Sequence, residues 1–322
     1  MNHQRPRACP ALVIGGSAGA LDPLRRLVAD IPQDFPAAVF VVSHVPAASV
    51  SALPHLLARC GALFATHAID GAPIAPGRII VAPPDHHVIL QEGVMGVLQG
   101  PMENNHRPSI DVLFRSAAAN CNSGACGVLL SGMRDDGVAG IVAIHDAGGV
   151  AFVQDPNEAQ FADMPLNAIA TGAVDGVYPA ERLIDAIQGW LSNSTFQNDG
   201  VVAPQDEREA GIPSVFTCPD CGGTLWELDA GSALRFRCRT GHAYSGHQML
   251  ASHKPKLESA LWASIRALEE RRDLLRRLAK RTRQHGEGAS TRQFERQAAD
   301  IVADLERVHA ALANFTALAS PA

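Results

Sequence analysis

A ten-residue stretch near the start of the chain, residues 11–20, reads ALVIGGSAGA. Its first four residues are apolar and mostly branched, which is typical of a fully buried strand, and residues 21–30 are compatible with a helix. Between them, Gly15, Ser17 and Gly19 form G-x-S-x-G, the pattern of a nucleophilic serine on a sharp strand-to-helix turn. A dinucleotide-binding loop needs G-x-G-x-x-G, which this stretch does not match. The stretch therefore predicts either a catalytic serine or a tight turn that carries a surface serine.

Short apolar segments alternate with helical ones from residue 11 to about residue 191. We expect strands at 11–14, 37–43, 62–67, 78–82, 127–130, 150–154 and 174–177, helices at 21–30, 50–59, 109–119, 138–146 and 180–191, and a hairpin at 87–98. This alternation predicts an α/β fold with a doubly wound, mostly parallel sheet that is covered by helices on both faces. In such sheets, functional residues gather at the carboxyl ends of the strands.

Three kinds of polar residue follow three of these strands. Ser17 follows the first strand, His44 follows the second, and Asp135 and Asp136 lie in the loop after strand 127–130. A histidine can accept the proton of a serine, and a carboxylate can orient the histidine. The order serine, histidine, aspartate differs from the order in α/β-hydrolases, so a lipase or esterase of that class is disfavoured. Either aspartate could instead cap the helix that follows.

Four segments occur in order: GGSAGA at 15–20, VVSHVP at 41–46, RPSIDVLFRSA at 107–117 and LLSGMRDDGVAG at 129–140, with FVQDP and MPLNA downstream. Together they resemble the catalytic domain of chemotaxis protein-glutamate methylesterases. The resemblance implies hydrolysis of glutamate methyl esters on a receptor or receptor-like protein, and often deamidation of glutamine, with no cofactor for catalysis. It implies Ser17 as nucleophile, His44 as base and Asp136 as orienting acid, with Ala18 and Met133 in the oxyanion region.

The chain departs from that family in two ways. Ala18 stands where the family commonly has threonine, which removes a hydroxyl beside the nucleophile. Only about ten residues precede the first expected strand, so we expect a stand-alone catalytic domain without the receiver domain that the family usually carries. The alternative function is a non-enzymatic regulatory module built on the esterase fold. The intact serine, histidine and aspartate favour the enzyme.

Composition excludes several other classes of protein. The chain has 322 residues, 47% of them hydrophobic, which suffices for a large core and about two domains. A net charge of -6 disfavours a general nucleic-acid binder. No run of about 18 apolar residues occurs, so we expect no membrane insertion. An odd count of 7 cysteines without a disulfide-like framework favours a reducing compartment, and therefore a cytoplasmic location.

Residues 192–214 are polar, rich in glycine and proline, and without periodicity, which predicts a linker after a catalytic domain at 1–191. In the following segment, 215–246, Cys218 and Cys221 are spaced C-x-x-C, and Cys238 and His242 are spaced C-x-x-x-H. Four such ligands suit a structural, tetrahedral zinc ion. A redox pair or inert thiols is the alternative. Because a linker separates the two domains, we expect zinc loss to unfold this module and leave the catalytic domain folded.

Residues 247–322 show apolar residues at helical spacing, from 257 to 278 and again from 294 to 315. This spacing predicts a helical hairpin or coiled coil, with a connection at 281–290 and a capping box at Ser290 and Gln293. Residues 256–283 carry nine basic and four acidic side chains. A surface of this charge suits a helical, acidic partner better than nucleic acid.

Overall fold

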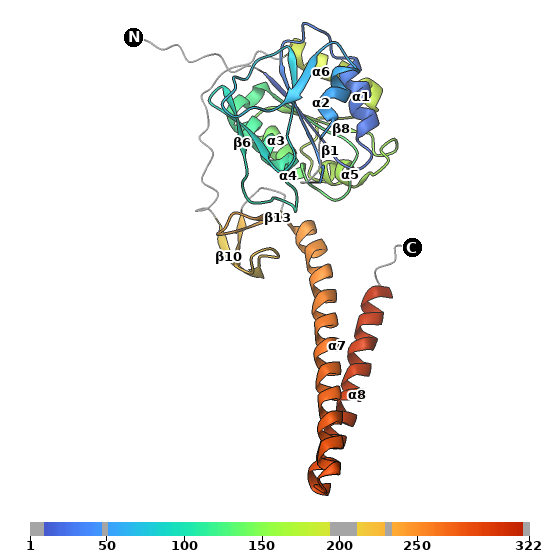
Figure 1. Ribbon diagram of the computed structural model, residues 1–322. Helices are drawn as coiled ribbons and strands as arrows, with labels where there is room; N and C mark the ends of the chain where they lie inside the picture. Colours follow the sequence, from blue (N-terminus) through green and yellow to red (C-terminus); the bar gives the residue numbers. More distant parts are fainter. Residues whose placement is uncertain (1–9, 47–50, 194–210, 229–233, 318–322) are drawn as a thin grey trace, which may run out of the picture. The chain divides into compact units, whose positions relative to one another are not determined.

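The computed structural model describes residues 10–46, 51–193, 211–228 and 234–317. The chain forms two compact units, Met1–Met249 and Leu250–Ala322. The first contains an α/β domain and a small antiparallel sheet, and the second contains most of a helical hairpin (Figure 1). Residues 194–210, which make up most of the expected linker, lie outside the described residues.

Seven parallel strands form the main sheet, in the order β3-β4-β2-β1-β7-β8-β9. They are β1 (Ala11–Gly16), β2 (Ala38–Ser43), β3 (Phe64–His67), β4 (Arg78–Val81), β7 (Ala125–Leu129), β8 (Val150–Gln154) and β9 (Gly176–Tyr178). The chain builds outward from β1 on the β2 side and then returns to pair β7 with the other edge of β1. This reversal makes the carboxyl end of β1 the topological switch point of the sheet, where ligands of open α/β sheets bind.

Helices cover both faces of this sheet. One face packs against α1 (Leu21–Ala29), α2 (Leu53–Ala58) and α6 (Leu183–Asn193), and the other against α3 (Ile110–Cys121), α4 (Val138–Asp146) and α5 (Asp163–Ala170). Strand β1 contributes to both cores, since Val13 packs on the α3 side while Leu12 and Ile14 pack on the α1 side. Burial on both faces explains why its sequence is a continuous apolar run. The α/β fold expected from the sequence is confirmed.

Two local expectations changed in the structure. The expected helix at 50–59 is shorter, Leu53–Ala58, and α5 occupies a segment for which we expected no helix. Pro165 lies in the first turn of α5, where the missing N–H of proline costs no hydrogen bond. The expected hairpin is present as β5 (His87–Gln91) and β6 (Val94–Leu98).

A four-stranded antiparallel sheet follows, in the order β10-β11-β12-β13. Its strands are β10 (Ile212–Thr217), β11 (Thr224–Leu228), β12 (Arg235–Cys238) and β13 (Ala243–Ser245). Leu225, Phe236 and Tyr244 form its small core together with two cysteines. Strand β10 begins inside the segment 192–214, because Ile212 already pairs with Glu227 of β11. We call residues 211–246 the Cys/His module.

The two last helices, α7 (Gly246–Gln284) and α8 (Gly288–Ala317), form a hairpin, and the second unit contains α7 from Leu250 onward and all of α8. Ile265 and Leu275 of α7 pack against Ile301 and Leu305 of α8. The expected hairpin is confirmed, but α8 begins at Gly288, so Ser290 lies inside the helix and the expected capping box is wrong. Over the described residues, neither this hairpin nor any other helix has the length and apolarity needed to cross a membrane.

The α/β core makes a direct prediction about stability. Phe114 of α3 is fully buried, so Phe114→Ala should lower the free energy of unfolding by about 3–5 kcal/mol through lost burial and the cavity left behind. Phe64→Ala is the matched control: Phe64, on edge strand β3, is 69% exposed, and the expected change is within about 0.5 kcal/mol. Urea denaturation followed by circular dichroism measures both, and equal losses would contradict this assignment of the core.

Candidate active site

Ser17 lies in the turn between β1 and α1. Two glycines of its motif occupy positions where a side chain would clash with neighbouring atoms. Gly19 has a φ of 74°, and an added Cβ there would lie 2.7 Å from Ser131 Oγ. At Gly15 an added Cβ would lie 2.3 Å from Ile110 Cγ2. The turn can therefore present Ser17 only because positions 15 and 19 lack a side chain.

His44 and Asp136 meet Ser17 at the same edge of the sheet. His44 follows β2, and Asp136 lies in the loop between β7 and α4. Ser17 Oγ lies 2.9 Å from His44 Nδ1, and His44 Nε2 lies 2.8 Å from Asp136 Oδ2. The imidazole thus bridges a hydroxyl and a carboxylate, the arrangement in which it can take the proton of the serine. The structure brings together all three residues selected from the sequence.

Asp136 is held as a carboxylate although it is almost fully buried. Besides the bond from His44, it accepts hydrogen bonds from Ser109 Oγ at 2.8 Å and from the Ile110 N–H at 2.7 Å. Ile110 is the first residue of α3, so the amino end of that helix faces the charge. Burial opposes ionisation, but the hydrogen bond and charge of His44 outweigh it and keep the pKa of Asp136 below its usual value.

The neighbouring Asp135 points away from the imidazole. Its Oδ2 lies 3.4 Å from His247 Nδ1, and burial raises the pKa of its carboxyl group. The loop therefore separates the two adjacent aspartates, and only Asp136 contacts His44. This geometry favours Asp136 over Asp135 as the residue that orients His44.

His106 is part of the site and was missed in the sequence. Its ring stacks on that of His44, with centroids 3.6 Å apart and an angle of 8° between the planes. Burial, followed by the neighbouring His44, lowers the pKa of His106 to about 4, so it is neutral at pH 7. A neutral, flat ring fixes the plane of His44 without adding charge. The residue lies in a loop without periodicity, beside RPSID, and only that proximity could have singled it out.

A second buried carboxyl group lies next to Asp136. Asp111 accepts a hydrogen bond from the Gly140 N–H at 2.7 Å and another from Asn104 Nδ2 at 2.8 Å. Burial and the charge of Asp136 raise its pKa to about 7. Two adjacent buried carboxyl groups ionise unequally, and here the one that faces the imidazole carries the charge.

The backbone N–H groups at Ser17 and Ala18 differ in whether they already have a hydrogen-bond acceptor. The Ser17 N–H donates to Ser131 O at 3.0 Å and is therefore engaged, whereas the Ala18 N–H has no acceptor among the described residues. Ala18 directly follows Ser17, and an unengaged amide at this position can donate to an oxyanion formed at Ser17. Met133 is 52% exposed, so it is not a core residue.

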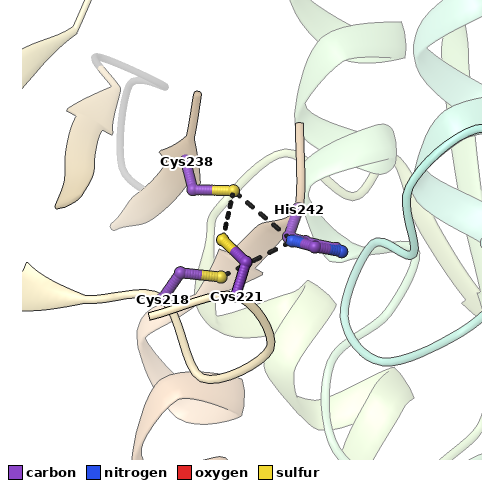
Figure 2. Close-up of side chains that lie close together, drawn as sticks. All are labelled: Cys218, Cys221, Cys238 and His242. Carbon is purple, nitrogen blue, oxygen red and sulfur yellow. Dashed lines mark hydrogen bonds between the residues drawn. The ribbon is translucent and has the colours of Figure 1, made fainter. Parts of the chain in front are cut away.

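Cys218, Cys221, Cys238 and His242 form a compact cluster in the Cys/His module (Figure 2). One ligand atom from each lies within 4.8 Å of all the others. Cys221 Sγ lies 3.6 Å from Cys238 Sγ, and His242 Nδ1 lies 3.5 Å from Cys238 Sγ. A tetrahedral ion about 2.3 Å from sulfur and about 2.0 Å from nitrogen needs edges of about 3.5–3.8 Å, so the cluster fits a metal.

Two further features support metal binding by this cluster. The Gly223 N–H and the Thr240 hydroxyl lower the pKa of Cys221 to about 6, which favours the thiolate that a metal requires. Asp220 Oδ2 lies 4.0 Å from His242 Nε2, the ring nitrogen that faces away from the cluster. A carboxylate near the second ring nitrogen is common for histidines that bind a metal.

Comparison with known proteins gives a consistent result for the α/β domain. A family model described as CheB methylesterase matches residues 12–187. The protein-glutamate methylesterase/protein-glutamine glutaminase 2 of Rhodospirillum rubrum is 37% identical over 176 residues, covering 53% of this chain and 48% of its own. The protein-glutamate methylesterase/protein-glutamine glutaminase 1 of Geobacter metallireducens is 35% identical over 186 residues, covering 56% of this chain and 51% of its own. The chain thus spans about half the length of the curated relatives it matches.

A solved structure agrees with these matches. The crystal structure of the Thermotoga maritima CheB methylesterase catalytic domain has a TM-score of 0.54 and 30% sequence identity, and covers 56% of this chain and 97% of that one. The family match includes Ser17, His44 and Asp136 and ends before the Cys/His module. Since this match spans more than half of the sequence, the chain belongs to the CheB methylesterase family.

Proposed function

We propose that the chain hydrolyses glutamate methyl esters on chemoreceptor-like proteins, with Ser17 as nucleophile. The observation that carries the proposal is the hydrogen-bonded series from Ser17 Oγ through His44 to Asp136 at the switch point of the sheet. The series lies within the region that matches the CheB methylesterase model. An assembled series also favours an enzyme over a regulatory module that has kept only the fold.

The geometry supports a two-step acyl transfer. His44 Nδ1 takes the proton of Ser17 as its oxygen attacks the ester carbonyl, and the Ala18 N–H donates to the oxyanion. The tetrahedral intermediate expels methanol, which receives the proton from His44 and leaves an acyl-enzyme. His44 then activates a water molecule that releases the glutamate side chain and restores Ser17. The ionised Asp136 stabilises the imidazolium in both steps.

The same steps would deamidate glutamine, with ammonia instead of methanol as the leaving group. The names of the relatives include both methylesterase and glutaminase. We propose the ester as the main substrate, because an ester carbonyl is more electrophilic than an amide carbonyl, which is stabilised by resonance with its nitrogen. Neither reaction requires a cofactor at Ser17.

Substitution of the nucleophile tests this proposal. Ser17→Ala should lower methanol release from a methylated receptor fragment by about 10⁴-fold or more, because the members of a triad act as a unit. Asp136→Asn should also cause a severe loss, whereas Asp135→Asn is a matched control with a mild effect, since Asp135 does not contact His44. Near-normal methanol release by Ser17→Ala would exclude Ser17 as the nucleophile.

We further propose that the Cys/His cluster binds one structural zinc ion. The protein supplies four ligands and so leaves no open position for catalysis. Elemental analysis of protein purified without chelators should find one zinc per chain. Cys218→Ser should lose it, while Cys60→Ser, a change to a cysteine of the α/β domain, should retain it. Metal-free wild-type protein would contradict this assignment.

The helical hairpin is the proposed contact for a helical, acidic partner, such as the receptor that carries the substrate. Helix α7 has an excess of basic side chains, and Leu257 and Trp262 are about half exposed on it. Replacing the exposed Arg271, Arg277 and Lys280 with glutamine should weaken activity on intact, membrane-embedded receptors and leave turnover of a small soluble methyl ester nearly unchanged. Equal effects on the two substrates would contradict a docking role.

A further inference from the structure

Asn104 belongs to the loop between β6 and α3, and it pairs with strand β13 of the Cys/His module. Its backbone N–H donates to Ala243 O at 2.8 Å. Its side-chain Oδ1 accepts a hydrogen bond from the Ser245 N–H at 3.0 Å. The two bonds attach the loop to β13 through both the backbone and the side chain of one residue. The module therefore contacts the catalytic domain, contrary to the independence that we expected from a linker.

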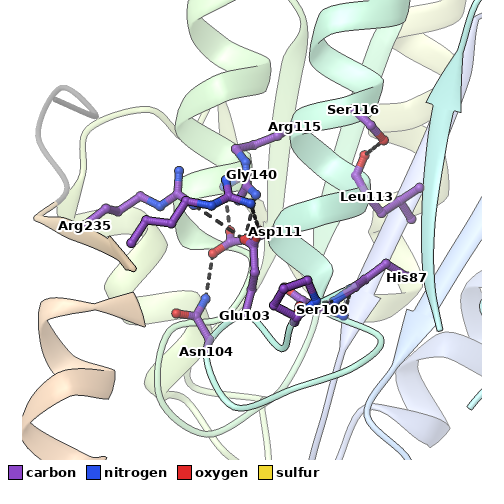
Figure 3. A network of polar contacts seen from close by, with 12 residues as sticks. His87, Glu103, Asn104, Ser109, Asp111, Leu113, Arg115, Ser116, Gly140 and Arg235 are labelled. Atoms are coloured by element: carbon purple, nitrogen blue, oxygen red, sulfur yellow. Dashed lines mark hydrogen bonds and ion pairs between the residues drawn. The ribbon is translucent and has the colours of Figure 1, made fainter. Parts of the chain in front are cut away.

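The other end of the same side chain reaches the active site. Asn104 Nδ2 lies 3.0 Å from Asp136 Oδ1. It also lies 2.8 Å from Asp111 Oδ2 (Figure 3). An amide nitrogen between two carboxyl groups acts as donor, and an amide oxygen facing an N–H acts as acceptor, so the orientation of the amide is determined. Asn104 is 3% exposed, so water does not replace these partners. The side chain thus joins β13 directly to Asp136.

Ion pairs of Glu103 also connect the Cys/His module to the loop that carries Asn104. Glu103 is buried, and its Oε2 lies 2.6 Å from Arg115 Nη2 of α3 and 3.5 Å from Arg235 Nη2 of β12 (Figure 3). Its Oε1 lies 3.7 Å from Arg237 Nη2, also of β12. Burial opposes ionisation of Glu103, but the three arginines outweigh it and lower its pKa. One buried carboxylate beside Asn104 therefore pairs with both the α/β domain and the module.

Two residues of the Cys/His cluster flank the turn that leads into β13, the strand that Asn104 contacts. Cys238 is the last residue of β12, and His242 directly precedes Ala243, the first residue of β13. A metal bound by Cys238 and His242 would fix the turn between these two strands. The same turn sets the positions of Ala243 O and the Ser245 N–H, the two groups that bind Asn104.

We propose that Asn104 is a positioning residue for Asp136, and that the metal-held strand β13 sets its position. The Cys/His module is then part of the support of the active site. Asn104 acts through Asp136 and His44, so it affects the rate of the chemical step more than the binding of substrate. The inference rests on the proposed function, because it takes Asp136 as the residue that orients His44.

Two neighbouring asparagines allow a matched test in the full chain. Asn104 and Asn105 have φ values of 52° and 64°, which glycine adopts without strain. The side chain of Asn104 donates to Asp136, whereas that of Asn105 donates to Gln248 Oε1 at 3.5 Å. Asn104→Gly should lower kcat on a methylated receptor fragment by about 10- to 100-fold with little change in KM, since it removes a hydrogen bond to a charged group. Asn105→Gly should leave kcat nearly unchanged. Normal kcat in a folded Asn104→Gly protein would overturn the inference.

Hydrogen exchange in the wild-type protein tests the link between the metal and the loop without relying on a variant that folds. Zinc is removed with a chelator, its loss is verified by elemental analysis, and hydrogen exchange is followed by mass spectrometry. Exchange should accelerate in peptides covering residues 101–113, which include the Ile110 N–H bonded to Asp136, and not in peptides covering β1. Unchanged exchange in 101–113, or an equal rise in β1, would overturn the link between the metal and this loop.

A fluorophosphonate probe that reacts with activated serines tests the proposed function and the positioning role of Asn104 separately. It should label Ser17 of the wild-type protein, and label Asn104→Gly more slowly. A wild-type protein that remains unlabelled at Ser17 would refute the proposed function itself. Labelling of the two proteins at equal rates would refute the positioning role of Asn104 and leave the proposed function intact.

Discussion

The parallel pairing of β1 with β2 on one side and β7 on the other is the constraint on which the site depends. Gly16 at the end of β1 is in register with Ser43, the residue before His44, and Gly15 is in register with Leu129 near the end of β7. Three loops therefore leave the sheet at one edge, side by side. The pairing needs a central strand that is buried on both faces, and the apolar run at the start of β1 supplies it.

The buried carboxylates at this edge of the sheet need hydrogen-bond donors or cations from several parts of the chain. An isolated buried charge is costly, so each carboxylate requires its own donors or cations. Asp136 receives them from His44 and the start of α3, and Glu103 from arginines of α3 and of strand β12. Asp111 has fewer partners, and its pKa rises to about 7. The loop that connects these groups also supplies His106, which stacks on His44.

Features with a local or periodic signal could be predicted from the sequence. The strands and helices of the α/β domain follow from apolar runs and turn residues, and the glycines around Ser17 mark its turn. Asp135 and Asp136 could not be separated by spacing, because adjacent residues point in different directions only once the loop is folded. Asn104 and His106 were missed because they lie in a loop without periodicity and act through contacts distant in sequence. The same reason explains why polar composition alone suggested an independent module, when Asn104 joins it to the catalytic domain.

The activity proposed for Ser17 requires attack at the carbonyl carbon of a glutamate methyl ester and cleavage of the bond between that carbon and the methoxy oxygen. Hydrolysis of a methylated receptor fragment in water enriched with ¹⁸O tests it most directly, with both products analysed by mass spectrometry. Attack at the carbonyl predicts that one ¹⁸O atom enters the glutamate carboxylate and that the released methanol contains none. Methanol that carries ¹⁸O, or a receptor fragment that is not hydrolysed, would contradict the account.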